Sequence, residues 1–113
     1  MIANFEKEIN RLEKICNEKS CTVYAEGSGF SGSVCQTPVT VNESLESLAL
    51  RDKKDNLIFM QIWLDEIVRI IFRDDFTNGW QDVDGCIPDN VSAIVETAGE
   101  HGTRFQFFDQ DEK

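Results

Sequence analysis

The stretch RDDFTNGWQDVDG, residues 73–85, holds the densest group of side chains able to do chemistry. Four aspartates surround two large aromatic residues there, and Asn78-Gly79 is typical of a tight turn in an exposed loop. Such a loop could hold a divalent cation, supply two catalytic carboxylates or contact a protein partner. The acidic residues are Asp74, Asp75, Asp82 and Asp84, and the aromatic residues are Phe76 and Trp80.

A calcium loop of the EF-hand type is excluded by the spacing around DVDG. If Gly85 takes the sixth position of that loop, Trp80 stands where the first ligand belongs and Val91 stands where the bidentate glutamate belongs. A looser site built from the four aspartates remains an alternative, and a flexible loop would bind the ion weakly. We therefore expect no resident metal in this segment.

The four cysteines do not have the spacing of a zinc site. Cys16 and Cys21 form one pair, but Cys35 and Cys86 have no near neighbour, and neither completes the usual short knuckle. Cys16 falls on an apolar helix stripe and Cys35 falls within a strand, which is typical of small buried thiols. We expect free thiols and no cofactor, with a Cys₄ zinc site as the alternative.

No catalytic signature is present either. The single histidine, His101, lies in GEHGT, and no nucleophile motif accompanies it. The segment GSGFSGSV, residues 27–34, matches the glycine-rich pattern G-x-G-x-x-G-x-V, but no helix follows it to hold a pyrophosphate. It resembles the protein-kinase glycine-rich loop, yet the chain lacks the HRD and DFG triplets. We expect a glycine hairpin whose tip presents Phe30 to a partner, and no enzymatic activity.

Charge is the most unusual property of the composition. The 113 residues carry 21 acidic and 11 basic side chains, a formal net charge of −10. Residues 1–73 hold 11 acids and 9 bases, whereas residues 74–113 hold 10 acids and 2 bases, so the net charge is −2 in the first part and −8 in the second. This distribution excludes direct nucleic-acid binding and disfavours anionic membranes, because both partners are negatively charged. It favours a basic partner, although acidity that serves only solubility is the alternative.

The first element we expect is a helix over residues 2–20. Phe5, Ile9, Leu12 and Cys16 recur at helical spacing, and charged residues of both signs occupy the other face. The apolar stripe could pack on a core or support a homodimer. No stretch approaches the roughly 20 apolar residues of a membrane span, and no leader follows the start, so we expect a soluble cytoplasmic protein.

Strands are predicted over most of the remaining chain. Pro38 confines the segment 33–41 to an edge or a bulge. In the segment 67–74 we expect Val68, Ile70 and Phe72 on one face, and residues 91–99 fit either a strand or a short helix. The other predicted strands cover residues 21–26, 45–52, 57–64 and 103–110.

These elements predict a single domain over residues 1–113 of the α+β class. One N-terminal amphipathic helix packs on a mostly antiparallel, curved β-sheet of about five to seven strands. Trp80 either covers this sheet as a core residue or anchors a partner. The four aspartates are too many and too close together to be buried, so they face water or a basic partner.

With metal binding and catalysis disfavoured, residues 73–85 are best interpreted as a protein-recognition surface. Rows of carboxylates can occupy a basic nucleic-acid channel in place of phosphates. In size, acidity and lack of catalytic motifs the chain resembles the small DNA-mimicking inhibitors of phages and mobile elements, such as anti-CRISPR and anti-restriction proteins. An immunity-type or adaptor protein and a small metal- or ligand-binding module are the alternatives.

Overall fold

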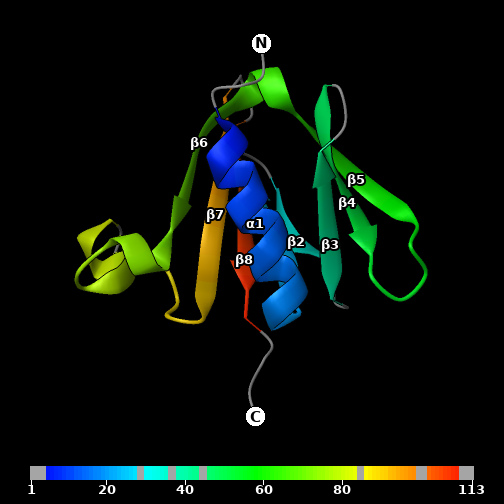
Figure 1. Cartoon of the computed structure of the whole chain (residues 1–113). Coiled ribbons are helices and arrows are strands. Elements are labelled where there is room, and N and C mark those ends of the chain that lie inside the picture. Colours follow the sequence, from blue (N-terminus) through cyan, green and yellow to red (C-terminus); the bar gives the residue numbers. More distant parts are fainter. Residues whose placement is uncertain are drawn as a thin grey trace.

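The computed structural model describes residues 5–27, 30–35, 38–43, 46–83, 86–98 and 102–109. In these ranges the chain forms one α-helix, short 3₁₀ turns and eight strands, which make one five-stranded and one three-stranded antiparallel sheet (Figure 1). The predicted α+β class is confirmed. The sheet differs from the expectation in one respect, because the strands divide into two sheets instead of forming one curved sheet.

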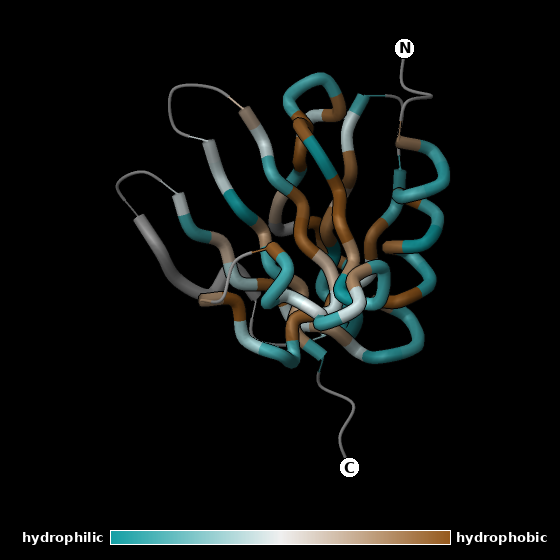
Figure 2. Tube along the Cα trace, turned by 90° about the vertical axis from the view of Figure 1, so that its left-hand side faces the viewer, coloured by the Kyte–Doolittle hydropathy of each residue, from teal (hydrophilic) through white to brown (hydrophobic). Residues whose placement is uncertain are grey.

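The helix α1 (Glu6–Lys19) buries the apolar stripe predicted from the sequence. Ile9, Leu12 and Cys16 are fully buried, and Ser20 ends the helix in the left-handed region with φ of 52°. Figure 2 shows hydrophilic residues on the outward side of this helix and hydrophobic residues on the side facing the strands. Within the described ranges, no helix is long and apolar enough to cross a membrane.

The larger sheet has five antiparallel strands in the order β2-β1-β8-β7-β6. It contains the predicted hairpin of β7 and β8. Residues 91–99 also fitted a short helix, but residues 91–97 form a strand, with Ala93 and Val95 facing the core. The strands are β1 (Thr22–Gly27), β2 (Phe30–Cys35), β6 (Ile67–Phe72), β7 (Val91–Thr97) and β8 (Thr103–Phe108).

The smaller sheet has three antiparallel strands in the order β3-β4-β5. These are β3 (Val39–Glu43), β4 (Ser47–Asp52) and β5 (Ile58–Trp63), and the predicted hairpin of residues 45–52 with 57–64 is the β4–β5 pair. The single strand predicted over residues 33–41 is in fact two strands, one in each sheet. Pro38 lies at the break, where its lack of an N–H prevents a continuous ladder. Val39 then donates a backbone hydrogen bond of 2.9 Å to Cys21.

The main core lies between α1 and the inward faces of both sheets (Figure 1). It contains Leu12 from the helix, Leu48 and Leu50 from β4, and Phe105 and Phe107 from β8. A second, smaller cluster covers part of the outward face of the five-stranded sheet and is built around Trp80, Ile87, Val91 and Ile94. The five-stranded sheet therefore has apolar residues on both faces, and the chain after β6 covers part of its outward face.

The alternation expected for residues 67–74 is wrong at its first position. Ile70 and Phe72 are buried as predicted, but Val68 is exposed and Ile67 is buried in its place. The pairing of β6 with β7 shifts register between Ile67 and Arg69, and such a bulge moves the side chains before it to the other face.

Candidate functional site

The acidic segment, defined here as residues 73–83, follows β6 as two 3₁₀ turns. The turn η3 spans Arg73–Asp75 and η4 spans Gly79–Asp82. Gly79 has φ of 63°, a left-handed conformation that glycine adopts without the steric cost of a Cβ atom, so the predicted Asn78-Gly79 turn is confirmed. The segment projects from one side of the molecule at the end of β6 (Figure 1).

Trp80 anchors this segment to the five-stranded sheet. Its side chain is 1% exposed and packs with Ile87, Val91 and Ile94, and its Nε1–H donates a 2.6 Å hydrogen bond to the Val91 carbonyl. The ring of Phe76 lies 6.0 Å from the Trp80 ring. Trp80 is therefore a core residue, the first of the two interpretations of the sequence, and its ring is not presented at the surface.

The described aspartates of the segment are exposed, as predicted. Asp74 has 72% of its side chain exposed, and it accepts a 3.3 Å bond from Arg73. Asp82 accepts bonds from the backbone N–H and the side-chain amide of Asn78, at 3.0 and 3.2 Å. This pair of bonds closes the loop around Gly79, so Asp82 shapes the segment in addition to charging it.

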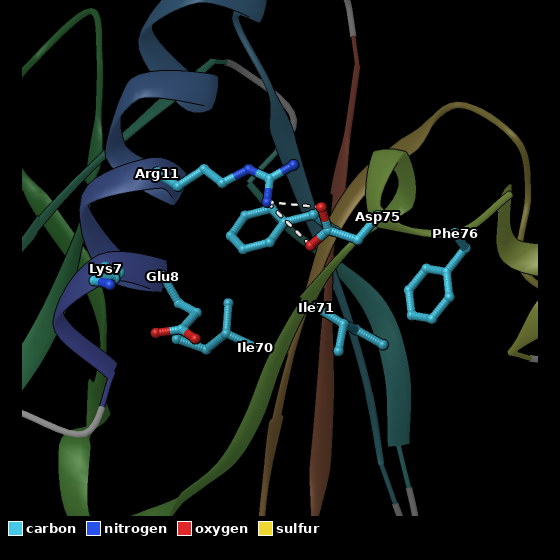
Figure 3. A pocket seen from close by; sticks show the side chains of 8 residues that line it. Lys7, Glu8, Arg11, Ile70, Ile71, Asp75 and Phe76 are labelled. Atoms are coloured by element: carbon cyan, nitrogen blue, oxygen red, sulfur yellow. Dashed lines mark hydrogen bonds and ion pairs between the residues drawn. The ribbon is translucent and has the colours of Figure 1, made fainter.

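Asp75 forms an ion pair with the helix. The Arg11 guanidinium donates to both carboxylate oxygens of Asp75 at 3.0 Å, and the same guanidinium lies 4.2 Å from the centre of the Phe72 ring (Figure 3). Both bonds come from the same nitrogen, Nη1, and together with the stacking on Phe72 they link α1 to the acidic segment. Both side chains remain partly exposed, at 39% and 51%, so water and salt screen the attraction.

A shallow hollow of about 170 Å³ lies beside this ion pair. Ile70, Ile71 and Phe76 form its apolar part, and charged side chains of α1 stand along its rim (Figure 3). An apolar floor with a charged rim is the arrangement of a protein contact.

Arg11 and Arg73 are the residues that the sequence argument missed. Arg11 belongs to the charged face of α1, and no sequence signal relates it to Asp75, which lies 64 residues away. Arg73 was assigned to a strand, yet its guanidinium donates a 2.7 Å bond to the Asp89 carbonyl and so ties the segment to the chain before β7. These two cations partly neutralise the acidic segment.

Several predicted site residues lie outside the described part of the chain. Asp84 and His101 are among them, and Phe30 is described only by its backbone at the start of β2. Within the described ranges no group of three or more His, Cys, Asp or Glu side chains is arranged to hold a metal ion. Cys16 and Cys21 are buried free thiols, and the hydrogen bond to Cys21 together with burial raises the pKa of the Cys16 thiol.

A charged ladder runs across the outward face of the five-stranded sheet. Glu96 accepts a 2.6 Å bond from Arg69 on β6 and a 3.2 Å bond from Arg104 on β8. The bond from Arg69 outweighs the effect of partial burial and lowers the pKa of the Glu96 carboxyl. The ladder places charges at the free edge of β6, a position where charge opposes pairing with another strand.

A wider concave region of about 450 Å³ lies further along the same face. Tyr24, Arg104 and Gln106 come from the strands, and Cys86 and Pro88 come from the chain before β7. Its polar groups could orient a small molecule, which keeps the ligand-binding alternative in view. Comparison with known protein families, curated proteins and solved structures finds no match to this chain.

Proposed function

We propose that this protein is a small, non-enzymatic binding protein whose acidic segment contacts a basic surface of a protein partner. The partner class we favour is an enzyme that handles nucleic acid, whose basic channel the carboxylates would occupy in place of phosphates. In this proposal the protein is an inhibitor of the kind that phages and mobile elements carry.

The observation that carries the proposal is the exposure of Asp74, Asp75 and Asp82 on a segment with a buried anchor. Trp80 and the Arg11–Asp75 pair hold the segment in one arrangement, so little conformational freedom is lost on binding. The excess of eight negative charges over residues 74–113 adds long-range attraction to a basic partner.

The test is capture from lysate of the source cells with wild type and with the double variant Asp74→Asn/Asp75→Asn. A matched control, Glu18→Gln/Glu46→Gln, removes two exposed negative charges from α1 and from the residue before β4. We expect one nucleic-acid enzyme to be retained by wild type and by the control, and about tenfold weaker binding by the aspartate variant. DNA or RNA substrate of that enzyme should displace the protein.

Two results would count against the proposal. Equal loss of binding in both double variants would show that total charge matters and that the acidic segment does not. A captured partner that nucleic acid fails to displace would favour the immunity-type or adaptor function, in which the contact lies away from a nucleic-acid channel.

A further inference from the structure

The strand β5 is an open edge of the three-stranded sheet. Among the described strands it pairs only with β4, so one side of its backbone has no strand partner. The backbone N–H and C=O groups on such a side form a template for another strand. Edges of this kind are usually protected by charged side chains, as Arg69 protects β6.

Residues 57–63, LIFMQIW, contain no charged side chain, although 28% of the whole chain is charged. Of the four large apolar residues that are exposed in the described part of the chain, three lie in this stretch: Leu57 at 65%, Ile58 at 45% and Trp63 at 47%. β-Branched and aromatic side chains at an unprotected edge favour addition of a further strand. The stretch therefore exposes apolar side chains along a strand edge that pairs with no further described strand.

The exposed side chains of β5 share one face of the sheet. Ser47 and Arg51 lie on the same face of β4, because they are separated by an even number of residues. Their partners across the pair are Trp63 and Ile58, and the register shift at Phe59 keeps both partners on that face. An added strand would therefore meet an uncharged strip, made of Ile58, Gln61 and Trp63, beside its own backbone.

The two ends of β5 carry opposite charge. The turn before it, residues 53–57, has two bases and one acid, and the turn after it contains Asp65 and Glu66 without a base. If two copies of β5 pair antiparallel, the basic end of each chain lies beside the acidic end of the other. A parallel pairing would instead bring like charges together.

We propose that β5 pairs antiparallel with β5 of a second copy of this chain, which joins two three-stranded sheets into one six-stranded sheet. A two-fold axis relates the copies, so the same uncharged strip serves both sides of the interface. The acidic segment lies on the opposite side of the molecule from β5 (Figure 1), and its charge does not oppose this contact. The proposal does not depend on the function proposed above.

This interface replaces the one considered from sequence. The helix stripe is unavailable for a homodimer, because Ile9, Leu12 and Cys16 are completely buried in the core of a single chain. The strand edge is available because the three-stranded sheet ends there and no described segment covers it.

The first test is the solution mass as a function of concentration, measured by sedimentation equilibrium. We expect wild type to pass from the monomer mass of 12.9 kDa to twice that value. The dissociation constant should be on the order of 10 μM, because one strand and its uncharged strip form a small interface. Trp63→Lys and Ile58→Lys, each placing a charge on the strip, should each raise this constant at least about tenfold.

Val68→Lys is the matched control. Val68 is 55% exposed and lies on β6, the free edge of the other sheet, so the same new charge should leave the dissociation constant unchanged. Circular dichroism of all three variants verifies that they stay folded. A wild-type mass of 12.9 kDa at all concentrations up to roughly fifty times the expected constant would overturn the proposal. A wild-type dissociation constant in both β5 variants, or a raised constant only in Val68→Lys, would also overturn it.

A charge swap tests the antiparallel direction. Lys53→Glu/Lys54→Glu places acid at both ends of β5 and should weaken the dimer. Adding Asp65→Lys/Glu66→Lys exchanges the two ends and should restore the wild-type constant, with both effects reduced by salt. If the fourfold variant is weaker than the twofold one, the ends do not meet and antiparallel pairing is wrong.

Discussion

The two tryptophans of this protein occupy opposite environments. Trp80, in the acidic segment, is buried and hydrogen-bonded to Val91, whereas Trp63, at the end of the uncharged strand β5, is about half exposed. The acidic segment attracts attention in the sequence because of its charges, but its apolar residues belong to the core. β5 looks like an ordinary buried strand in the sequence, yet Ile58 and Trp63 are exposed and only its other face, with Ile62, packs in the core.

This contrast shows that a local pattern identifies which residues are apolar and cannot say what covers them. Residues around Trp80 fold back on the outward face of the five-stranded sheet, and Arg73 and Asp82 fix that arrangement. β5 is an edge strand of its sheet, and no described strand pairs with its outer side. Tryptophan is thus a core residue in one place and a half-exposed residue in the other.

The largest expected effect is a difference in the free energy of unfolding between variants of the two tryptophans. Trp80→Ala should lower the free energy of unfolding by about 3–5 kcal/mol, because it empties the centre of the second core cluster. Trp63→Ala should lower it by less than about 1 kcal/mol, because its ring is already hydrated. Urea unfolding at low protein concentration measures both. Similar losses for the two variants would mean that the contrast is wrong.

A smaller change isolates the hydrogen bond of Trp80. Trp80→Phe keeps a large ring but removes the Nε1–H donor, which leaves the Val91 carbonyl without that bond. We expect a loss of about 1–2 kcal/mol in the free energy of unfolding. Trp63→Phe serves as the control and should leave stability unchanged. An unchanged Trp80→Phe variant would show that packing alone holds the segment.

The β6 edge carries the charged ladder that β5 lacks, and the stability supplied by this ladder can be measured through its pH dependence. The Arg69 bond lowers the pKa of Glu96 in the folded protein below its unfolded value. The resulting stability is complete above the unfolded pKa of about 4.3 and is lost as the pH falls through the lowered folded pKa. Glu96→Gln should cost about 1 kcal/mol at neutral pH and less in acid.

Urea unfolding of the Glu96→Gln variant between neutral and acidic pH measures this difference. Glu66→Gln, an exposed glutamate in the turn before β6, is the control and should show no such convergence with wild type. If the cost of Glu96→Gln persists unchanged in acid, the ladder does not stabilise the β6 edge through charge.

The smallest expected effect concerns the ion pair that joins α1 to the acidic segment. A double-mutant cycle with Arg11→Met and Asp75→Asn should give a coupling of about 0.2–1 kcal/mol, because both groups are partly exposed. Added salt should reduce this coupling. Arg11→Met should cost more than Asp75→Asn, since it also removes the contact with the Phe72 ring. A coupling of zero would leave the segment held by Trp80 alone.

The sequence predicted much of the fold where local chemistry decides it. The helix was predicted from its apolar spacing, the turn at Gly79 from an Asn-Gly pair, and the β4–β5 hairpin from two apolar runs around a polar turn. The exposure of the described aspartates followed from the cost of burying charge. The division into two sheets did not follow, because pairing of strands depends on contacts between distant segments.

The sequence by itself determined the amphipathic helix, the strand-forming segments, the strongly acidic composition of the C-terminal part and the exposure of Asp74, Asp75 and Asp82. Periodicity, turn chemistry and desolvation act on neighbouring residues, so these properties can be read without the fold. Only the tertiary structure decided that Trp80 is buried, that Arg11 meets Asp75 and that β5 is an open edge. Each of these depends on which distant segment packs against a given residue, and the arrangement of the helix, the turns and the two sheets decides it.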